Sequence, residues 1–216
     1  MANINAPKGL TPVQDRSGNP WNQQADLMCV PSTDATYTYA IGDVVKSING
    51  FDVNGIPYIQ KISATTDQPL GVVVGVRVAD PGVSLQGTTL DLTQTYVPAA
   101  KSRNYYLYVV CDPDLIFEAQ CDADAGNVLY QGNAAMYKNI NPNVPTASQA
   151  NLIQNPLSSM TLLSTTLTAN TAMFRLHGPV IRVNNVFSTT SGVGSPYLAV
   201  RVSWNKHEYF GTWTAV

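Results

Sequence analysis

The stretch of sequence that decides the fold is TYVPAAKSRNYYLYVVCDPDLIFEAQ, residues 95–120. It contains two runs of aromatic and β-branched residues, 105–110 and 115–120, and these residue types favour a pleated, half-buried strand. Both faces of the first run are apolar or aromatic, so we expect that strand to be covered on both sides. Between the runs, the sequence CDPD at 111–114 has the chemistry of a turn. The stretch therefore predicts a central β-hairpin.

The composition extends this prediction to the whole chain. Charged residues make up 12% of the 216 residues, and glutamate is nearly absent. Thr, Asn, Val, Gly and Pro are abundant instead, and they favour strands and turns over helices. Short strand signals recur at close spacing along the chain, so we expect an all-β fold: a β-sandwich or jelly roll, or a β-barrel. A single domain of this size needs no disulfide to be stable.

The first 26 residues differ from the rest. They contain several Pro and Gly residues and almost no periodicity, which predicts an extended N-terminal arm, either flexible or ordered against another surface. Residues 27–216 are expected to form one β-rich domain. The segment 139–159 is rich in Asn, Pro, Ser and Gln, and it is the best candidate for an insertion loop or an internal boundary.

Alternating apolar residues and turn signals mark the other strands. Asn-Gly pairs at 49–50 and 54–55 are strong turn signals. In 197–204 the alternation places Leu198, Val200, Val202 and Trp204 on the inward face. The expected strands outside the central stretch cover residues 27–30, 37–41, 44–48, 56–62, 70–78, 127–130, 134–138, 161–168, 172–176, 180–187 and 197–204.

Charge and hydropathy exclude two classes of partner. The formal net charge is −2, and the Lys and Arg residues are scattered, whereas a nucleic-acid backbone requires a clustered positive surface. No stretch approaches the ~18 apolar residues that cross a membrane. The first residues also lack the apolar core of a signal peptide. We expect synthesis in the cytosol, with no nucleic-acid or membrane partner.

The three cysteines, Cys29, Cys111 and Cys121, fit no metal-binding spacing. Their simplest interpretation is as small buried side chains in a reducing compartment. A Cys111–Cys121 disulfide is the alternative, because the two residues flank the same expected strand.

The sequence contains no convincing catalytic or metal site. His177 and His207 have no Cys or His partner at metal spacing, and we expect both at the surface or in an interface. Carboxylates occur in pairs at 112 and 114 and at 122 and 124, as glycosidases require, but all four lie in turns, where Asp commonly bonds to the backbone. No nucleophile elbow is present. We therefore predict no enzyme activity, no cofactor and no metal.

Aromatic residues and prolines are the better candidates for binding. Trp21, at the end of the arm, is either an interface anchor or a plug for its own domain. The tail 207–216 is unusually aromatic for a terminus, so we expect it to pack on its own domain or on a neighbouring chain. The candidate interface residues are Pro12, Pro20, Trp21, Tyr197, Tyr209 and Trp213.

Several segments together resemble a known family. They are MANINAPKGL at 1–10, SGNPWN at 17–22, IGDVV at 41–45, LGVVVG at 70–75, and the run 105–120 with its ending DPDLIFEAQ. These segments are similar to those of head decoration, or cement, proteins in the virions of tailed bacteriophages. The resemblance covers most of residues 1–137 and fades afterwards, and its motifs are structural rather than catalytic.

The resemblance implies a β-rich protein on the outside of an icosahedral capsid, assembled in the host cytoplasm. It would clamp neighbouring major capsid protein subunits against internal DNA pressure. Such binders need neutral, polar-aromatic contact surfaces and no active site. Many weak copies on one lattice give high avidity, and copies would form dimers or trimers at local axes. The alternative hypothesis is a receptor- or carbohydrate-binding module of a phage tail or fibre, and a third is a glycan hydrolase.

Overall fold

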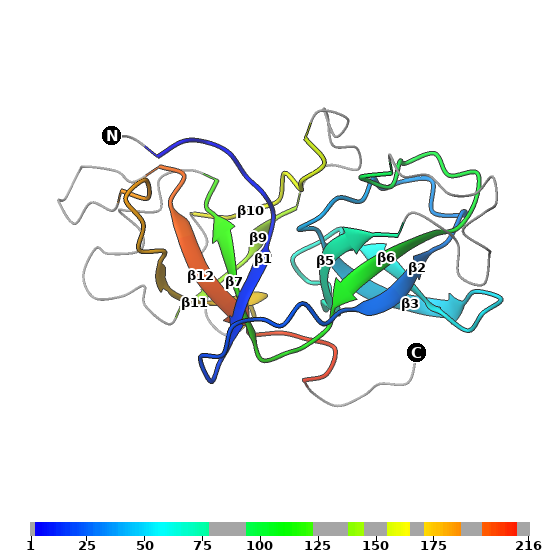
Figure 1. The fold of residues 1–216 in the computed structure, drawn as a ribbon, viewed down its shortest axis with the longest axis horizontal. Coiled ribbons are helices and arrows are strands. Elements are labelled where there is room, and N and C mark those ends of the chain that lie inside the picture. Colours follow the sequence, from blue (N-terminus) through cyan, green and yellow to red (C-terminus); the bar gives the residue numbers. More distant parts are fainter. Residues whose placement is uncertain are drawn as a thin grey trace.

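The computed structural model describes residues 3–77, 94–122, 138–144, 155–164, 171–186 and 196–210. These residues contain twelve strands and no helix. The strands form a closed five-stranded barrel, a five-stranded sheet and a two-stranded sheet. Figure 1 shows the barrel on one side of the molecule and the two sheets on the other. The prediction of an all-β fold is confirmed.

The five barrel strands follow one another in the sequence. Its strands are β2 (Asp26–Val30), β3 (Val44–Phe51), β4 (Pro57–Lys61), β5 (Gly71–Val76) and β6 (Tyr105–Val110). They close in the order β2-β4-β3-β5-β6, with β2 and β4 parallel and the other neighbours antiparallel. Closure leaves no unpaired edge. Buried side chains in its core include Val30, Val45, Ile59, Val73, Leu107 and Val109.

The five-stranded sheet has the order β1-β7-β12-β11-β8. Beside it, β9 pairs with β10. In β12 the expected alternation is confirmed, because Val200, Val202 and Trp204 are buried, and the Trp204 ring stacks on Phe174 at a centroid distance of 4.8 Å. The strands are β1 (Thr11–Asp15), β7 (Leu115–Gln120), β8 (Asn139–Ile140), β9 (Pro142–Asn143), β10 (Thr161–Leu162), β11 (Phe174–Pro179) and β12 (Ala199–Trp204).

The predicted central hairpin is wrong. Both strands exist, but β6 pairs with β2 and β5 in the barrel, whereas β7 pairs with β1 and β12 in the sheet. Residues 111–114 therefore carry the chain from one body to the other. Turn chemistry specifies a change of chain direction and not which strands pair. β6 is apolar or aromatic on both faces, whereas β7 carries Glu118 and Gln120 on the face opposite Leu115 and Phe117.

The expected arm contributes a strand to the fold. Within residues 3–26, β1 forms an edge of the five-stranded sheet, where Pro12 lies opposite Phe117 of β7. All the barrel strands lie between β1 and β7 in the sequence. The segment is thus bonded to its own chain through a long-range pairing that its local sequence does not indicate.

Several other expected strands are absent from the structure or lie outside the described residues. Residues 37–41 form two isolated bridges, Tyr39 with Val97 and Ile41 with Leu157, and no strand. The expected strand at 180–187 is wrong for its described residues, which form a turn in which the Asn185 side chain bonds to the backbone of Val180 and Ala199. The expected strand at 127–130, most of that at 134–138, and residues 145–154 of the loop at 139–159 lie outside the described residues.

A tight backbone contact fastens the barrel to the sheet. Gly9 and Gly42 both have positive φ, 68° and 95°. The Leu10 N–H donates to the Gly42 carbonyl at 3.0 Å, and a Cβ atom at Gly42 would lie 2.3 Å from the Lys8 carbonyl oxygen. Only glycine allows both this conformation and this close approach.

A buried ion pair between two barrel residues lies next to this contact. Lys61 Nζ lies 2.9 Å from Asp43 Oδ2, and both side chains are fully buried. The other carboxylate oxygen of Asp43 accepts a hydrogen bond from the Ser158 hydroxyl, while the Ser158 N–H donates to the Ile41 carbonyl at 2.8 Å. Asp43 therefore joins the barrel to the segment 155–164. Pairing and hydrogen bonds offset the cost of burying its charge.

The three cysteines are buried, as the simpler interpretation predicts, and no disulfide joins them. The Cys111–Cys121 alternative is wrong. Burial raises the pKa of both thiols to about 12.

Candidate functional site

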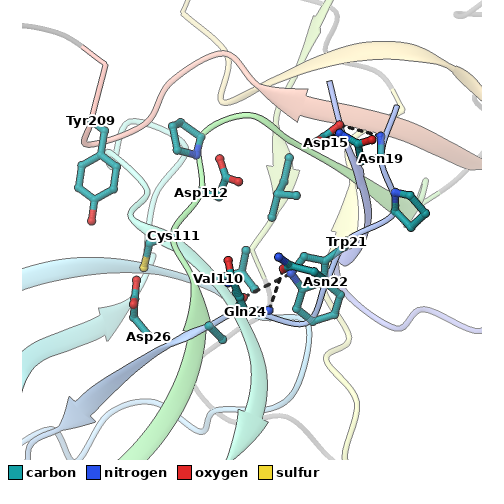
Figure 2. Close-up of a pocket in the computed structure, with 14 residues that line it drawn as sticks. Asp15, Asn19, Trp21, Asn22, Gln24, Asp26, Val110, Cys111, Asp112 and Tyr209 are labelled. Carbon is teal, nitrogen blue, oxygen red and sulfur yellow. Dashed lines mark hydrogen bonds between the residues drawn. The ribbon is translucent and has the colours of Figure 1, made fainter. Parts of the chain in front are cut away.

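The described residues line an open cavity of about 590 Å³ where the chain passes between the barrel and the sheet. Its lining comes from the connection 15–26 between β1 and β2, from the connection 110–115 between β6 and β7, and from Tyr209 after β12. Figure 2 shows these side chains around the opening. We call it the junction cavity. It exists because the chain crosses between the two bodies three times at one place.

The first connection is held by a turn around Asp15. Its carboxylate accepts hydrogen bonds from the Ser17 hydroxyl at 2.8 Å, and from the Asn19 backbone N–H at 2.9 Å and side-chain amide at 3.0 Å. The bonds from Asn19 and Ser17 lower the pKa of Asp15 below its usual value. The Trp21 N–H donates to the Val13 carbonyl at 3.1 Å. This places the half-buried Trp21 ring at the cavity.

The second connection is a short turn at 111–114. The Asp114 N–H donates to Asp112 Oδ1 at 2.8 Å, the usual way in which an Asp side chain stabilises a turn. The Asp114 carbonyl accepts from the Arg16 N–H at 2.9 Å, which ties the two connections together. The Arg16 guanidinium and the Asp114 carboxylate also form an exposed ion pair at 3.7 Å. Asp112 itself is exposed and lines the cavity.

The third element is the segment after β12, which returns to the barrel. The Glu208 N–H donates to the Pro69 carbonyl at 2.9 Å, and its carboxylate accepts from the Ser47 N–H at 2.7 Å. The Tyr209 N–H donates to His207 Nδ1 at 3.1 Å. These bonds hold the Tyr209 side chain, which is 46% exposed, at the cavity.

His207 is fully buried, so its prediction as a surface or interface residue is wrong. Its ring lies against Trp204 at a centroid distance of 5.3 Å and against Tyr209 at 5.0 Å. Burial lowers the pKa of His207 to about 4, and the side chain is therefore neutral at pH 7. The aromatic run at the end of the sequence indicated packing, but not that a histidine would be enclosed by it.

The structure brings three of the candidate interface residues together, because Pro20, Trp21 and Tyr209 all line the junction cavity. Pro12 is buried in β1. Tyr197 lies before β12, where its carbonyl accepts a hydrogen bond from Gln120 at 3.0 Å, and Trp213 lies outside the described residues. Whether any of these residues contacts a partner stays a prediction.

Sequence reasoning missed two carboxylates of the cavity, Asp15 and Asp26, and treated Asp112 only as a turn residue or part of a catalytic pair. In Figure 2, Asp26 and Tyr209 lie on one side, Trp21 and Asp15 on the other, and Asp112 between them. Their positions in the sequence are far apart, so no local motif could have grouped them. The sequence signal for the cavity was the turn chemistry of the segments that pass between the barrel and the sheet.

Nucleophilic chemistry is poorly supported at the cavity. Burial, with the Asp26 carboxylate beside it, raises the pKa of the Cys111 thiol to about 12, and a protonated thiol is a weak nucleophile. Elsewhere His177 Nε2 lies 2.9 Å from Ser203 Oγ. Ser203 is only 1% exposed, and burial together with Arg16 and Arg175 lowers the pKa of His177. That pair is better suited to joining β11 and β12 than to catalysis.

In the part of the chain that the structure describes, no group of three or more His, Cys, Asp or Glu side chains is arranged to hold a metal ion. Nor does any described helix have the length and apolar character to span a membrane. Comparison with protein-family models, with curated proteins and with solved structures finds no match to this chain.

Proposed function

We propose that this chain is a structural virion protein that binds the outside of an icosahedral phage capsid and links neighbouring major capsid proteins. The observation that carries this proposal is the exposure of apolar side chains on two turns at opposite ends of the molecule's longest axis: the β3–β4 turn of the barrel and the turn at 181–186, after β11 (Figure 1). A linking protein requires two separate contact sites.

The barrel end presents Phe51, which is 72% exposed, and Val53, which is 100% exposed. Hydrogen bonds to a buried side chain hold the turn that carries them in one conformation. The buried Asp52 carboxylate accepts hydrogen bonds from the Asn54 and Ile56 N–H groups at 2.9 and 2.8 Å, and from the Tyr106 hydroxyl at 2.8 Å. A fixed turn loses little conformational freedom on binding.

The sheet end presents Ile181 and Val183, which are 96% and 100% exposed. Asn3 exchanges two hydrogen bonds with the backbone of Val186 in the same turn, and this places the N-terminal segment, with its exposed Ile4, beside it. Single exposed apolar residues are common. Contiguous exposed apolar patches, in contrast, are typical of interaction sites.

Capsid binding by two pairs of variants tests the proposal. Phe51→Ser with Val53→Ser removes the apolar barrel end, and Ile181→Ser with Val183→Ser removes the sheet end. Each pair should lower the fraction that co-sediments with capsids by about tenfold, because each removes apolar contact area, while leaving the melting temperature unchanged. The matched control is Ala35→Ser with Ala100→Ser, two exposed residues outside both turns.

The capsids come from the virus that encodes the chain, prepared without this protein. Unaltered binding by either variant pair, or absence of binding by the unmodified protein, would contradict the proposal. Sedimentation of the free protein tests the dimer or trimer that the proposal includes.

A second candidate function is a receptor- or carbohydrate-binding module of a phage tail or fibre. It is favoured by one observation: Trp21, Tyr209 and several amide side chains line the junction cavity. Aromatic rings with a few polar groups are a common way to bind a small ligand. Glycan-array binding that Trp21→Ala abolishes would support this function, whereas a capsid-linking protein should bind no glycan.

A further inference from the structure

The junction cavity has the size and construction of a ligand site. Its volume of about 590 Å³ falls within the usual range of roughly 300–1,000 Å³ for such sites. Its walls are held in place by the turn around Asp15, the turn at 111–114 and the hydrogen-bonded segment after β12. The cavity is therefore formed before any ligand arrives.

The charge of the lining indicates the charge of the ligand. Asp15, Asp26 and Asp112 contribute carboxylates, and no Lys, Arg or His is among the lining residues. None of the ion pairs between described residues includes these three. The Asp15 carboxylate accepts three hydrogen bonds within its own turn, whereas Asp112 accepts one from the Asp114 N–H and Asp26 one from the Cys111 thiol. Asp26 and Asp112 therefore keep more capacity to accept from a ligand.

The aromatic residues of the cavity fit the same kind of ligand. Trp21 is half-buried and Tyr209 is 46% exposed, so both rings remain accessible from the opening. A cation is attracted to the face of an aromatic ring as well as to a carboxylate. A guanidinium group can also donate to a carboxylate through two parallel N–H groups. Neutral sugars gain less from carboxylates, because they bring no opposite charge.

We propose that the junction cavity binds an arginine- or lysine-containing segment of a partner protein, with Asp26 and Asp112 accepting the basic side chain and Trp21 and Tyr209 flanking it. The identity of that partner as the major capsid protein rests on the proposed function. The cavity then adds a charged contact to the two apolar ends.

Calorimetric titration of the full chain with an acetylated and amidated Gly-Arg-Arg-Gly peptide tests the binding step. We expect binding at low salt that weakens as salt rises, because salt screens exposed ion pairs. Asp26→Asn combined with Asp112→Asn should weaken binding about tenfold. Asp114→Asn makes the same change in the same connection but outside the lining, and should alter the affinity less than about twofold.

Binding of a Gly-Glu-Glu-Gly peptide as tightly as the arginine peptide would overturn the inference. So would no binding of the arginine peptide at low salt, or equal affinity in the double variant. Circular dichroism confirms that the double variant is folded, which we expect because both side chains are exposed.

Capsid binding by the same proteins separates this inference from the proposed function. If the unmodified protein binds the peptide but not capsids, the proposed function fails and the basic-segment site stands. If the unmodified protein and the double variant bind capsids equally, the cavity is not the capsid contact, and the assignment of the capsid protein as its partner is overturned. A parallel loss of peptide and capsid binding supports both.

Discussion

The barrel and the sheet meet in two contrasting ways. At the contact around Gly42 and Asp43, two backbones touch and a carboxylate is fully buried against Lys61. At the junction cavity, Asp26 and Asp112 face an opening without an ion pair among the described residues. Both places bring carboxylates to the boundary between the same two bodies.

The difference shows how burial decides what a charge can do. A carboxylate that is removed from water requires a partner, and the bond then acts as a fastening. A carboxylate that stays in contact with water needs no internal partner and remains available to an incoming cation. At the first contact Lys61 stabilises the buried Asp43 carboxylate, which bonds to Ser158 outside the barrel, whereas the second contact is open for binding.

The largest expected effect comes from breaking the buried pair. Lys61→Met leaves the Asp43 charge buried without its partner, and we expect a loss of about 3–5 kcal/mol in the free energy of unfolding, measured with urea. Lys61→Met combined with Asp43→Asn should lose less than the sum of the two single changes, because neither charge is then left alone.

The matched control for Lys61→Met is Asp114→Asn, which breaks the exposed pair with Arg16 and should cost less than about 1 kcal/mol. Equal losses for the buried and exposed pairs would mean that the Lys61–Asp43 pair contributes no more to stability than an exposed pair.

The next effect concerns the backbone contact. Gly42 and Gly18 share a φ of 95°, but a Cβ atom at Gly18 would meet nothing within 4 Å, whereas at Gly42 it would meet the Lys8 carbonyl at 2.3 Å. Gly18→Ala should therefore cost about 1 kcal/mol from the backbone conformation alone. Gly42→Ala should cost about 3 kcal/mol or more. Similar unfolding energies for the two variants would exclude the close approach as the cause.

The smallest expected effect is the pH dependence of stability that arises from His207, in the segment beside the cavity. The pKa of His207 falls from 6.5 to about 4 on burial, so between these values the unfolded chain binds a proton that the folded chain does not. Stability should therefore decrease as pH falls from about 6.5 towards 4, by about 3 kcal/mol. His207→Gln should flatten this dependence in urea unfolding measured at several pH values.

His177 provides the comparison for His207. Burial, Arg16 and Arg175 lower its pKa in the same direction, but it is only half-buried, so His177→Gln should flatten the curve less. Aspartates with lowered pKa, such as Asp67, lose their contribution only as pH falls below about 3.8, their unfolded value. A pH curve that is unchanged in the His207 variant would show that another group titrates in this range.

Some features of the fold could be predicted from the sequence, and others could not. The alternation at Val200, Val202 and Trp204 predicted the buried face of β12. Burial was the simplest interpretation of the three cysteines because their spacing fits no metal site. The pairing of β1 with β7 could not be predicted, because the whole barrel lies between them in the sequence. For the same reason Trp21 and Tyr209 were separate candidates, and only the fold places them at one cavity.

The sequence by itself determined that the chain forms strands and turns, and which face of several strands is buried, because side-chain direction alternates with every residue of a strand. Only the tertiary structure decided which strands pair, which aspartate lies beside Lys61, and which aspartates stay in water. Those outcomes depend on contacts between residues far apart in the chain, and a local pattern of residue types does not specify its distant partner.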